Sequence, residues 1–215
     1  MTVQLENVLP REIESRSFEI IGEELAAAGK VLDPEKELII KRCIHTSADF
    51  EYADSLKFSE DVVSKAMNAI RSGAVIVTDT QMAWSGINKR ALARYGGEAM
   101  CFMSDEDVAE QAKKNGTTRA TACIDKAAAL GKPVIFAIGN APTALVRIYE
   151  LVEEGKLKPE LVIGVPVGFV NVVQSKELIM SLEDVPYIVA AGRKGGSNIA
   201  ACIVNALLYK IDDRR

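Results

Sequence analysis

Short apolar runs from residue 74 onward are the clearest structural signal in this chain. They are rich in β-branched side chains and lack the polar–apolar alternation that is typical of a strand with one solvent-exposed face. Four of them predict buried strands, and a weaker fifth falls between the first two: Ala74–Val77, Ala99–Phe102, Pro133–Ala137, Leu161–Val165 and Tyr187–Ala190. Strands buried on both faces are typical of parallel sheets covered by helices.

Segments with helical periodicity separate these runs. They are predicted at residues 106–115, 118–130, 143–154, 174–182 and 197–210. Strands that alternate with helices indicate an α/β fold with a parallel sheet. We therefore predict a doubly wound, mostly parallel five-stranded sheet with helices on both faces, preceded by an N-terminal helical segment.

The N-terminal segment begins with a helix predicted from Pro10 to Ala28. Proline suits a first helical turn, and Gly29 follows directly as a stop signal. Ser17 lies on the apolar face of this helix, four residues after Ile13. A hydroxyl in such a position either bonds to its own backbone or is reserved for a ligand.

Two further helices are predicted before the first strand. Asp33-Pro34-Glu35 has the capping side chain, proline and acidic residue of a helix start, and another helix follows Ser59. No internal repeat or long linker interrupts the chain. We expect residues 1–215 to form a single domain.

Composition narrows the possible functions. The chain has 215 residues, of which 48% are hydrophobic, and this suits one α/β domain. A net charge of −4 and only 6% aromatic residues argue against a nucleic-acid-binding surface. We also find no signal-peptide pattern and no apolar run near the roughly 20 residues that cross a bilayer. A cytoplasmic protein that binds neither nucleic acid nor membrane is expected.

The four cysteines do not indicate a metal site. Cys43, Cys101, Cys123 and Cys202 are widely separated and form no CxxC pair. One histidine cannot complete a zinc site with such scattered thiols. We expect buried apolar cysteines in a reducing compartment and no protein-held metal.

His45 is the only histidine in the chain. Imidazole is the side chain whose ordinary pKa, about 6.5, best allows proton transfer near neutral pH. Leu38, Arg42 and His45 have the spacing of one helix face. By itself a single histidine is more often a surface or core residue, so its neighbours decide between the two interpretations.

Polar and glycine-rich loops follow four of the predicted strands. They are Thr78–Met82, Gly139–Thr143, Pro166–Asn171 and Gly192–Ser197. Parallel sheets bind ligands beyond the carboxyl ends of their strands, so we expect the site at this edge. The last loop opens a helix, where it is either an anion site or simply a tight turn. No GxGxxG, P-loop or GxSxG pattern occurs, so no nucleotide cofactor is expected.

Arg119 lies at the predicted start of an alanine-rich helix. A guanidinium there opposes the helix dipole, which an anionic partner would offset. The alternative is a solvated surface arginine.

The chain resembles the precorrin-8X methylmutase family, also called cobalt-precorrin-8 methylmutases, over nearly its whole length. The resemblance rests on the order and spacing of several segments together: Glu14–Phe18, Arg42–His45, Asn115–Arg119, Gly139–Leu145, Pro166–Val170, Ser175–Glu177 and Gly192–Ser197.

The resemblance implies a homodimeric isomerase of cobalamin biosynthesis that needs no cofactor. Such an enzyme moves a methyl group from carbon 11 to carbon 12 of a corrinoid ring, giving hydrogenobyrinate, or cobyrinate if cobalt is present. It implies that His45 is the catalytic proton donor and acceptor. Ser17, Arg42 and Arg119 are the substrate-binding residues that it implies.

Two other functions are compatible with parts of the sequence. A corrinoid carrier would bind the ring without changing it. A nucleotide-binding α/β protein is disfavoured by the missing glycine-rich fingerprints.

Overall fold

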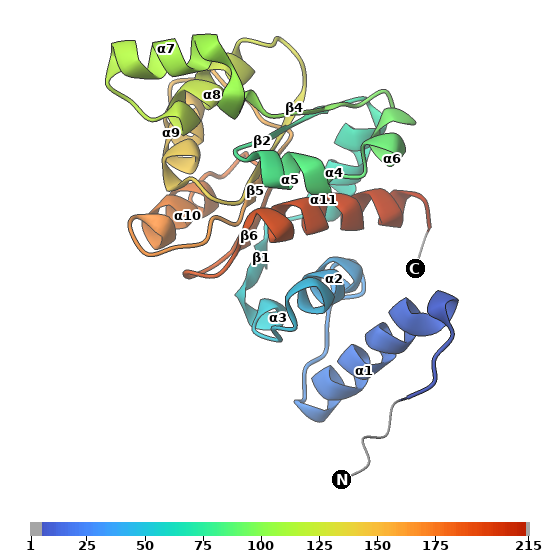
Figure 1. Ribbon diagram of the computed structural model, residues 1–215. Helices are drawn as coiled ribbons and strands as arrows, with labels where there is room; N and C mark the ends of the chain where they lie inside the picture. Colours follow the sequence, from blue (N-terminus) through green and yellow to red (C-terminus); the bar gives the residue numbers. More distant parts are fainter. Residues whose placement is uncertain (1–5, 214–215) are drawn as a thin grey trace.

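A six-stranded sheet forms the centre of the computed structural model, which describes residues 6–213 (Figure 1). The strand order is β1-β6-β5-β4-β2-β3, and every neighbouring pair is parallel except β1–β6. The strands are β1 (Leu56–Phe58), β2 (Val75–Thr78), β3 (Ala99–Met100), β4 (Val134–Ile138), β5 (Leu161–Gly164) and β6 (Tyr187–Ala190).

The five predicted strands are confirmed, but the predicted strand number is wrong because β1 was missed. β1 is three residues long and contains an exposed lysine, Lys57. It pairs antiparallel with β6, so that Leu56 lies opposite Ala190 and Phe58 opposite Ile188. One apolar residue on either side of a lysine is too short a pattern to indicate a strand.

In the five strands β2 to β6, successive residues enter two different cores. Ile76, Ile135 and Ile163 pack on one face of the sheet, whereas Val77 and Phe136 pack on the other. Both faces are therefore covered, as the continuous apolar runs predicted. The first core is covered by α1 (Ile13–Ala27), α2 (Glu37–Ser47), α3 (Tyr52–Ser55), α4 (Val62–Arg71), α5 (Gln81–Gly86), α6 (Lys89–Ala93) and α11 (Ser197–Ile211); the second is covered by α8 (Arg119–Ala128), α9 (Pro142–Glu153) and α10 (Val172–Met180).

One helix, α7 (Glu106–Asn115), lies outside these two cores, and α1 lies at the edge of the first core. α7 packs on α8 together with the short 3₁₀ turn Phe102–Ser104. α1 lies at the far end of the molecule, where its main partner is α2 (Figure 1). The end of the molecule that carries α1 and α2 is thus built mainly from helix–helix contacts.

The predicted N-terminal helices form, with small shifts at their starts. Pro10–Glu12 is a 3₁₀ turn that leads into α1, and Gly29 follows that helix with a φ of +67°. The Asp33 side chain accepts the N–H of Glu35, but residues 34–36 form a turn and α2 begins at Glu37. The four to six residues of α3, α5 and α6 are too few to show helical periodicity, so none of these was predicted.

Candidate functional site

His45 lies in the last turn of α2 and its side chain is exposed. The opposite face of this helix buries Ile40, Cys43 and Ile44 in the core, which turns His45 outward. The imidazole packs against Phe18 of α1, with ring centroids 5.6 Å apart and planes inclined by 40°. The ring is therefore oriented by an aromatic neighbour while it remains accessible to a ligand.

Arg42 lies one turn before His45 and is mostly buried, with 13% of its side chain exposed. Its guanidinium carbon lies 4.3 Å from the ring centroid of Tyr209 and 5.3 Å from that of Phe18. One terminal nitrogen pairs with Glu14 at 2.7 Å, whereas the buried Nε has no hydrogen-bond partner among residues 6–213. A buried donor without a partner costs about 1–3 kcal/mol, so Arg42 has unused capacity to bind an anion.

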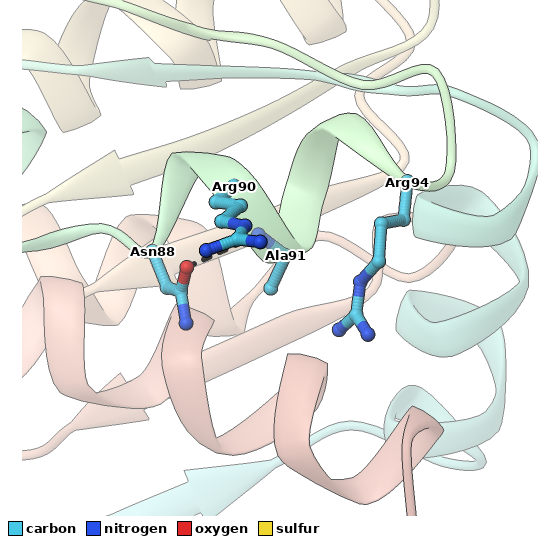
Figure 2. Close-up of a pocket in the computed structure, with 4 residues that line it drawn as sticks. All are labelled: Asn88, Arg90, Ala91 and Arg94. Carbon is cyan, nitrogen blue, oxygen red and sulfur yellow. Dashed lines mark hydrogen bonds between the residues drawn. The ribbon is translucent and has the colours of Figure 1, made fainter.

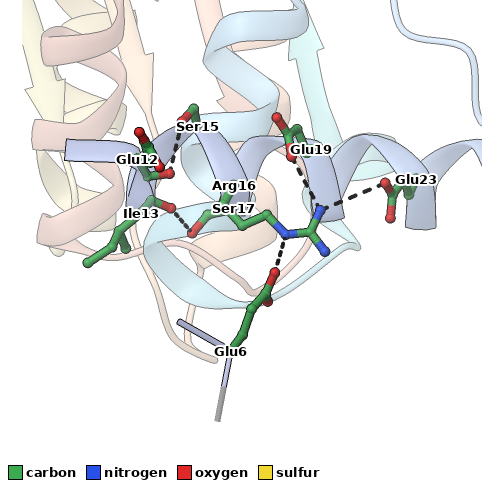
Figure 3. A network of polar contacts seen from close by, with 8 residues as sticks. All are labelled: Glu6, Glu12, Ile13, Ser15, Arg16, Ser17, Glu19 and Glu23. Carbon is green, nitrogen blue, oxygen red and sulfur yellow. Dashed lines mark hydrogen bonds and ion pairs between the residues drawn. The ribbon is translucent and has the colours of Figure 1, made fainter. Parts of the chain in front are cut away.

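Ser17 of α1 donates its hydroxyl proton to the carbonyl oxygen of Ile13 at 2.8 Å (Figure 3). This is the local backbone bond that the residue type allows on a helix. The adjacent Arg16 pairs with three glutamates, Glu6, Glu19 and Glu23. Ser17 can donate to a ligand only by exchanging its present acceptor, and Arg16 is already neutralised.

Phe18 is the side chain that links Arg42 and His45. It contacts both Arg42 and His45, and it lines a hollow of about 660 Å³ that also includes Leu38. The predicted shared face of Leu38, Arg42 and His45 is therefore confirmed. Sequence reasoning missed Glu14 and Phe18, although their spacing with Ser17 places all three on one face of α1.

The Gly192–Ser197 loop is fastened to the end of α2 by Lys194. Its Nζ lies 2.6 Å from Asp49 and 2.6 Å from Glu51, just beyond His45 in the chain. Hydrogen bonds to these carboxylates raise the pKa of Lys194 to about 12 and lower that of Asp49. The glycine-rich loop is consequently anchored to the chain segment that follows His45.

An exposed apolar strip borders this loop. Phe169 and Val170 are 80% and 79% exposed. The guanidinium carbon of Arg193 lies 5.4 Å from the Phe169 ring centroid, and the N–H of Gly168 donates to the carbonyl of Arg193. This part of the loop thus places a cation beside an exposed apolar surface.

Asp79 joins the loops that follow β2 and β4. Its buried carboxylate accepts the N–H groups of Gly139, Asn140 and Ala141 at 2.9, 2.8 and 2.6 Å. Burial raises the pKa of Asp79, and these hydrogen bonds oppose the rise. The order of the sheet reverses between β2 and β4, so Asp79 closes the crevice where such folds often bind ligands.

Arg119 lies elsewhere. It is the first residue of α8, exposed, and on the face of the sheet opposite α2. It forms no ion pair within residues 6–213. The structure therefore brings Arg42 and His45 together at Phe18, the residue next to Ser17, but does not bring Arg119 to them within one protomer.

Two further cavities differ in whether they include a residue of the group around His45. Arg42 lines one of about 350 Å³, together with Met82, Cys202, Asn205 and Tyr209. Another, of about 450 Å³, lies on α6 between Arg90 and Arg94, where the Asn88 side chain accepts the N–H of Ala91 (Figure 2). Only the first shares a residue with the group around His45.

The chemistry available around His45 is proton transfer next to an arginine that can bind an anion. A lone imidazole can give and take one proton, and Arg42 can bind a carboxylate. Within the part of the chain that the structure describes, no group of three His, Cys, Asp or Glu side chains could hold a metal ion. No described helix is long and apolar enough to cross a membrane.

A family model for precorrin-8X methylmutase matches residues 12–210. The chain belongs to the precorrin-8X methylmutase family. It is 47% identical over 206 residues to the cobalt-precorrin-8 methylmutase of Salmonella typhimurium, covering 94% of this chain and 96% of that protein. Identity to the cobalt-precorrin-8 methylmutase of Priestia megaterium is 46% over 205 residues, or 95% and 90% of the two chains.

The fold agrees with this membership. The solved structure of a precorrin-8X methyl mutase from Thermus thermophilus superposes with a TM-score of 0.84 at 36% identity, covering 94% of this chain and 98% of that one. The resemblance found in the sequence is confirmed, and the chain is an isomerase of the methylmutase family. These relatives give no support to a non-catalytic carrier.

Proposed function

We propose that this methylmutase moves a methyl group from carbon 11 to carbon 12 of precorrin-8X or cobalt-precorrin-8, with His45 as proton donor and acceptor. The products are hydrogenobyrinate and cobyrinate, respectively. One observation carries the assignment: the only histidine of the chain is exposed at the contact between α1 and α2, directly beside Arg42.

The role of His45 follows from the reaction type. Protonation of the nitrogen of ring C polarises the conjugated system and eases a 1,5-sigmatropic shift of the methyl group. Loss of that proton completes an isomerisation in which no atom is gained or lost. One group that donates and then recovers a proton is sufficient, and no redox or nucleotide cofactor is required.

Ser17, Arg42 and Arg119 are proposed to bind the carboxylates of the substrate. Arg42 is the best supported of the three. Its Nε is buried and has no partner among the described residues, and Glu14, which pairs with a terminal nitrogen of the same guanidinium, is half exposed. A substrate carboxylate can replace Glu14 on the guanidinium. Arg119, on the other face of the sheet, is the least supported.

Arg42→Met is expected to raise KM by about tenfold to a hundredfold, because a charge-assisted hydrogen bond contributes roughly 1.5–3 kcal/mol. The value of kcat should change much less, since a carboxylate far from the reacting carbons is bound equally before and during the reaction. Steady-state kinetics measure both. Arg94→Met, which also removes an arginine that pairs with a carboxylate, is the control and should leave KM unchanged. An unchanged KM in Arg42→Met would exclude Arg42 from substrate binding.

The direct test of the function is turnover of both substrate forms. The protein is incubated separately with precorrin-8X and with cobalt-precorrin-8, and the absorbance spectrum reports conversion to the product chromophore. Conversion of either form supports the proposal, and the faster form identifies the natural substrate. Binding with a spectral shift but without isomerisation would indicate a carrier instead.

The proposal includes a homodimer. Leu9, Ile13, Val31 and Met82 are large apolar side chains that a single protomer leaves between 51% and 96% exposed. In a dimer, Arg119 of one protomer can contact a corrinoid that is bound next to His45 of the other protomer. Sedimentation equilibrium should give twice the chain mass of 23.3 kDa, and a monomer at micromolar concentration would contradict this part.

We place the enzyme in the cytoplasm. Its four cysteines are all free thiols, which a reducing compartment maintains.

A further inference from the structure

Lys176 of α10 is buried, with only 1% of its surface exposed. It forms no ion pair with any described residue. Its Nζ instead donates to two backbone carbonyls of the neighbouring loop, those of Gly192 and Lys194, each at 2.8 Å. Burial lowers the pKa of Lys176 to about 8, so the amine is mostly protonated at neutral pH. A buried ammonium held only by loop carbonyls is costly, which indicates that it does more than fill space.

The two hydrogen bonds fix the direction of two peptide groups. In a trans peptide the carbonyl and the following N–H point in opposite directions, and the described chain contains no cis peptide. Carbonyls of Gly192 and Lys194 that face Lys176 therefore turn the N–H groups of Arg193 and Gly195 away from it. Within residues 6–213, neither of these N–H groups donates to a backbone or side-chain acceptor.

Further contacts support the same loop conformation. Gly195 has a φ of +156°, and a Cβ at this residue would lie 2.0 Å from the carbonyl oxygen of Val165. The N–H of Gly196 donates to that same oxygen at 2.8 Å. The loop is therefore packed closely against the residue that follows β5, and Lys176 holds two of its carbonyls.

The loop also reaches the catalytic neighbourhood. Lys194, whose carbonyl Lys176 binds, extends its side chain to Asp49 and Glu51 beyond the end of α2. Lys176 thus acts on a segment that is in contact with the chain just after His45. An ammonium beneath the loop adds positive potential where the two N–H groups face outward.

We propose that Lys176 is a positioning residue that holds the Gly192–Ser197 loop so that the N–H groups of Arg193 and Gly195 bind a carboxylate at the edge of the corrinoid. This inference rests on the proposed function, since it names the part of the substrate that the loop holds. Lys176 itself does not touch the substrate. Its effect is on binding of the ring and not on the proton transfer.

The test compares Lys176→Met with wild type in three measurements: KM and kcat, the Kd of the product cobyrinate by absorbance titration, and hydrogen exchange of the peptide that contains residues 192–197. Loss of the two backbone hydrogen bonds should raise KM and Kd by about tenfold. We expect kcat to stay within about threefold, because His45 is untouched. Exchange should become faster in this peptide alone.

Ser175→Ala is the matched control. Ser175 is the adjacent residue on α10 and is equally buried. Its hydroxyl donates to the carbonyl of Val172 within the same helix and to no residue of the loop that the structure describes. Lys176→Gln, neutral and shorter, serves if the methionine variant does not fold, and a raised KM is again expected. Lys176→Arg, which retains the charge and several donors, should recover part of the affinity.

Two results would overturn the inference. One is a neutral variant with the KM and Kd of wild type. The other is a joint loss of kcat and affinity with faster exchange throughout the protein, which would show a purely structural role. Failure of the wild-type protein to convert either substrate is a different result, because it contradicts the proposed function and leaves the exchange measurement interpretable.

Discussion

Replacing His45 with alanine is expected to lower kcat by about a hundredfold to ten-thousandfold, the usual contribution of a positioned proton donor. No second histidine is available to take over, since the chain has only one. The fold should persist, because the side chain is exposed and surface substitutions usually change the free energy of unfolding by less than about 0.5 kcal/mol. Product formation from precorrin-8X or cobalt-precorrin-8, followed by absorbance, measures the loss.

Two observations separate loss of chemistry from loss of structure in this variant. The Kd of cobyrinate should remain near that of wild type, because the proposed carboxylate contacts are intact. Thr46→Ala, a change at the next residue of the same exposed turn, is the control and should turn over normally. A His45→Ala enzyme with near wild-type kcat would refute the proposed proton transfer.

Replacing Asp79 with asparagine should have the largest effect on stability. The carboxylate accepts three backbone N–H groups, whereas an amide offers one oxygen and turns an NH₂ group toward the remaining donors. The N–H of Gly139 is buried and the other two are partly buried, so leaving one or two of them unpaired is expected to lower the free energy of unfolding by about 3 kcal/mol. Urea denaturation at neutral pH measures this change.

The matched control is Asp107→Asn. Asp107 is an exposed aspartate that pairs with Lys126, and such surface ion pairs contribute at most about 1 kcal/mol. If Asp79→Asn were no less stable than this control, the three hydrogen bonds would not be what holds the loops after β2 and β4 together.

The fold was largely predictable because its main signal is local. Leu161–Gly164 and Val134–Ile138 are buried at every position, so a continuous apolar run is sufficient to identify each strand. β1 lacks such a run, and its strand conformation depends on pairing with β6, which lies more than 120 residues further along the chain. Short elements determined by tertiary contacts leave no periodic pattern of their own.

The site was only partly predictable for the same reason. Helical spacing was sufficient to place Arg42 and His45 on one face, but their contacts with Phe18 and Glu14 depend on how α1 packs against α2. Asp79 was simply one polar residue in a loop until its partners, 60 residues later, were known. In the sequence Lys176 looks like any surface lysine of a helix. Burial of a charged side chain is a property of the assembled fold.

The position of α1 has a consequence for how a bulky ligand is admitted. This helix buries only Ile21 and Leu25, and its contacts with the rest of the chain are mainly with α2. Detaching it would break the Arg42–Glu14 pair and uncover little of the apolar interior, so such a local opening costs far less than global unfolding. A wide macrocycle could therefore pass between α1 and α2 while the sheet stays intact.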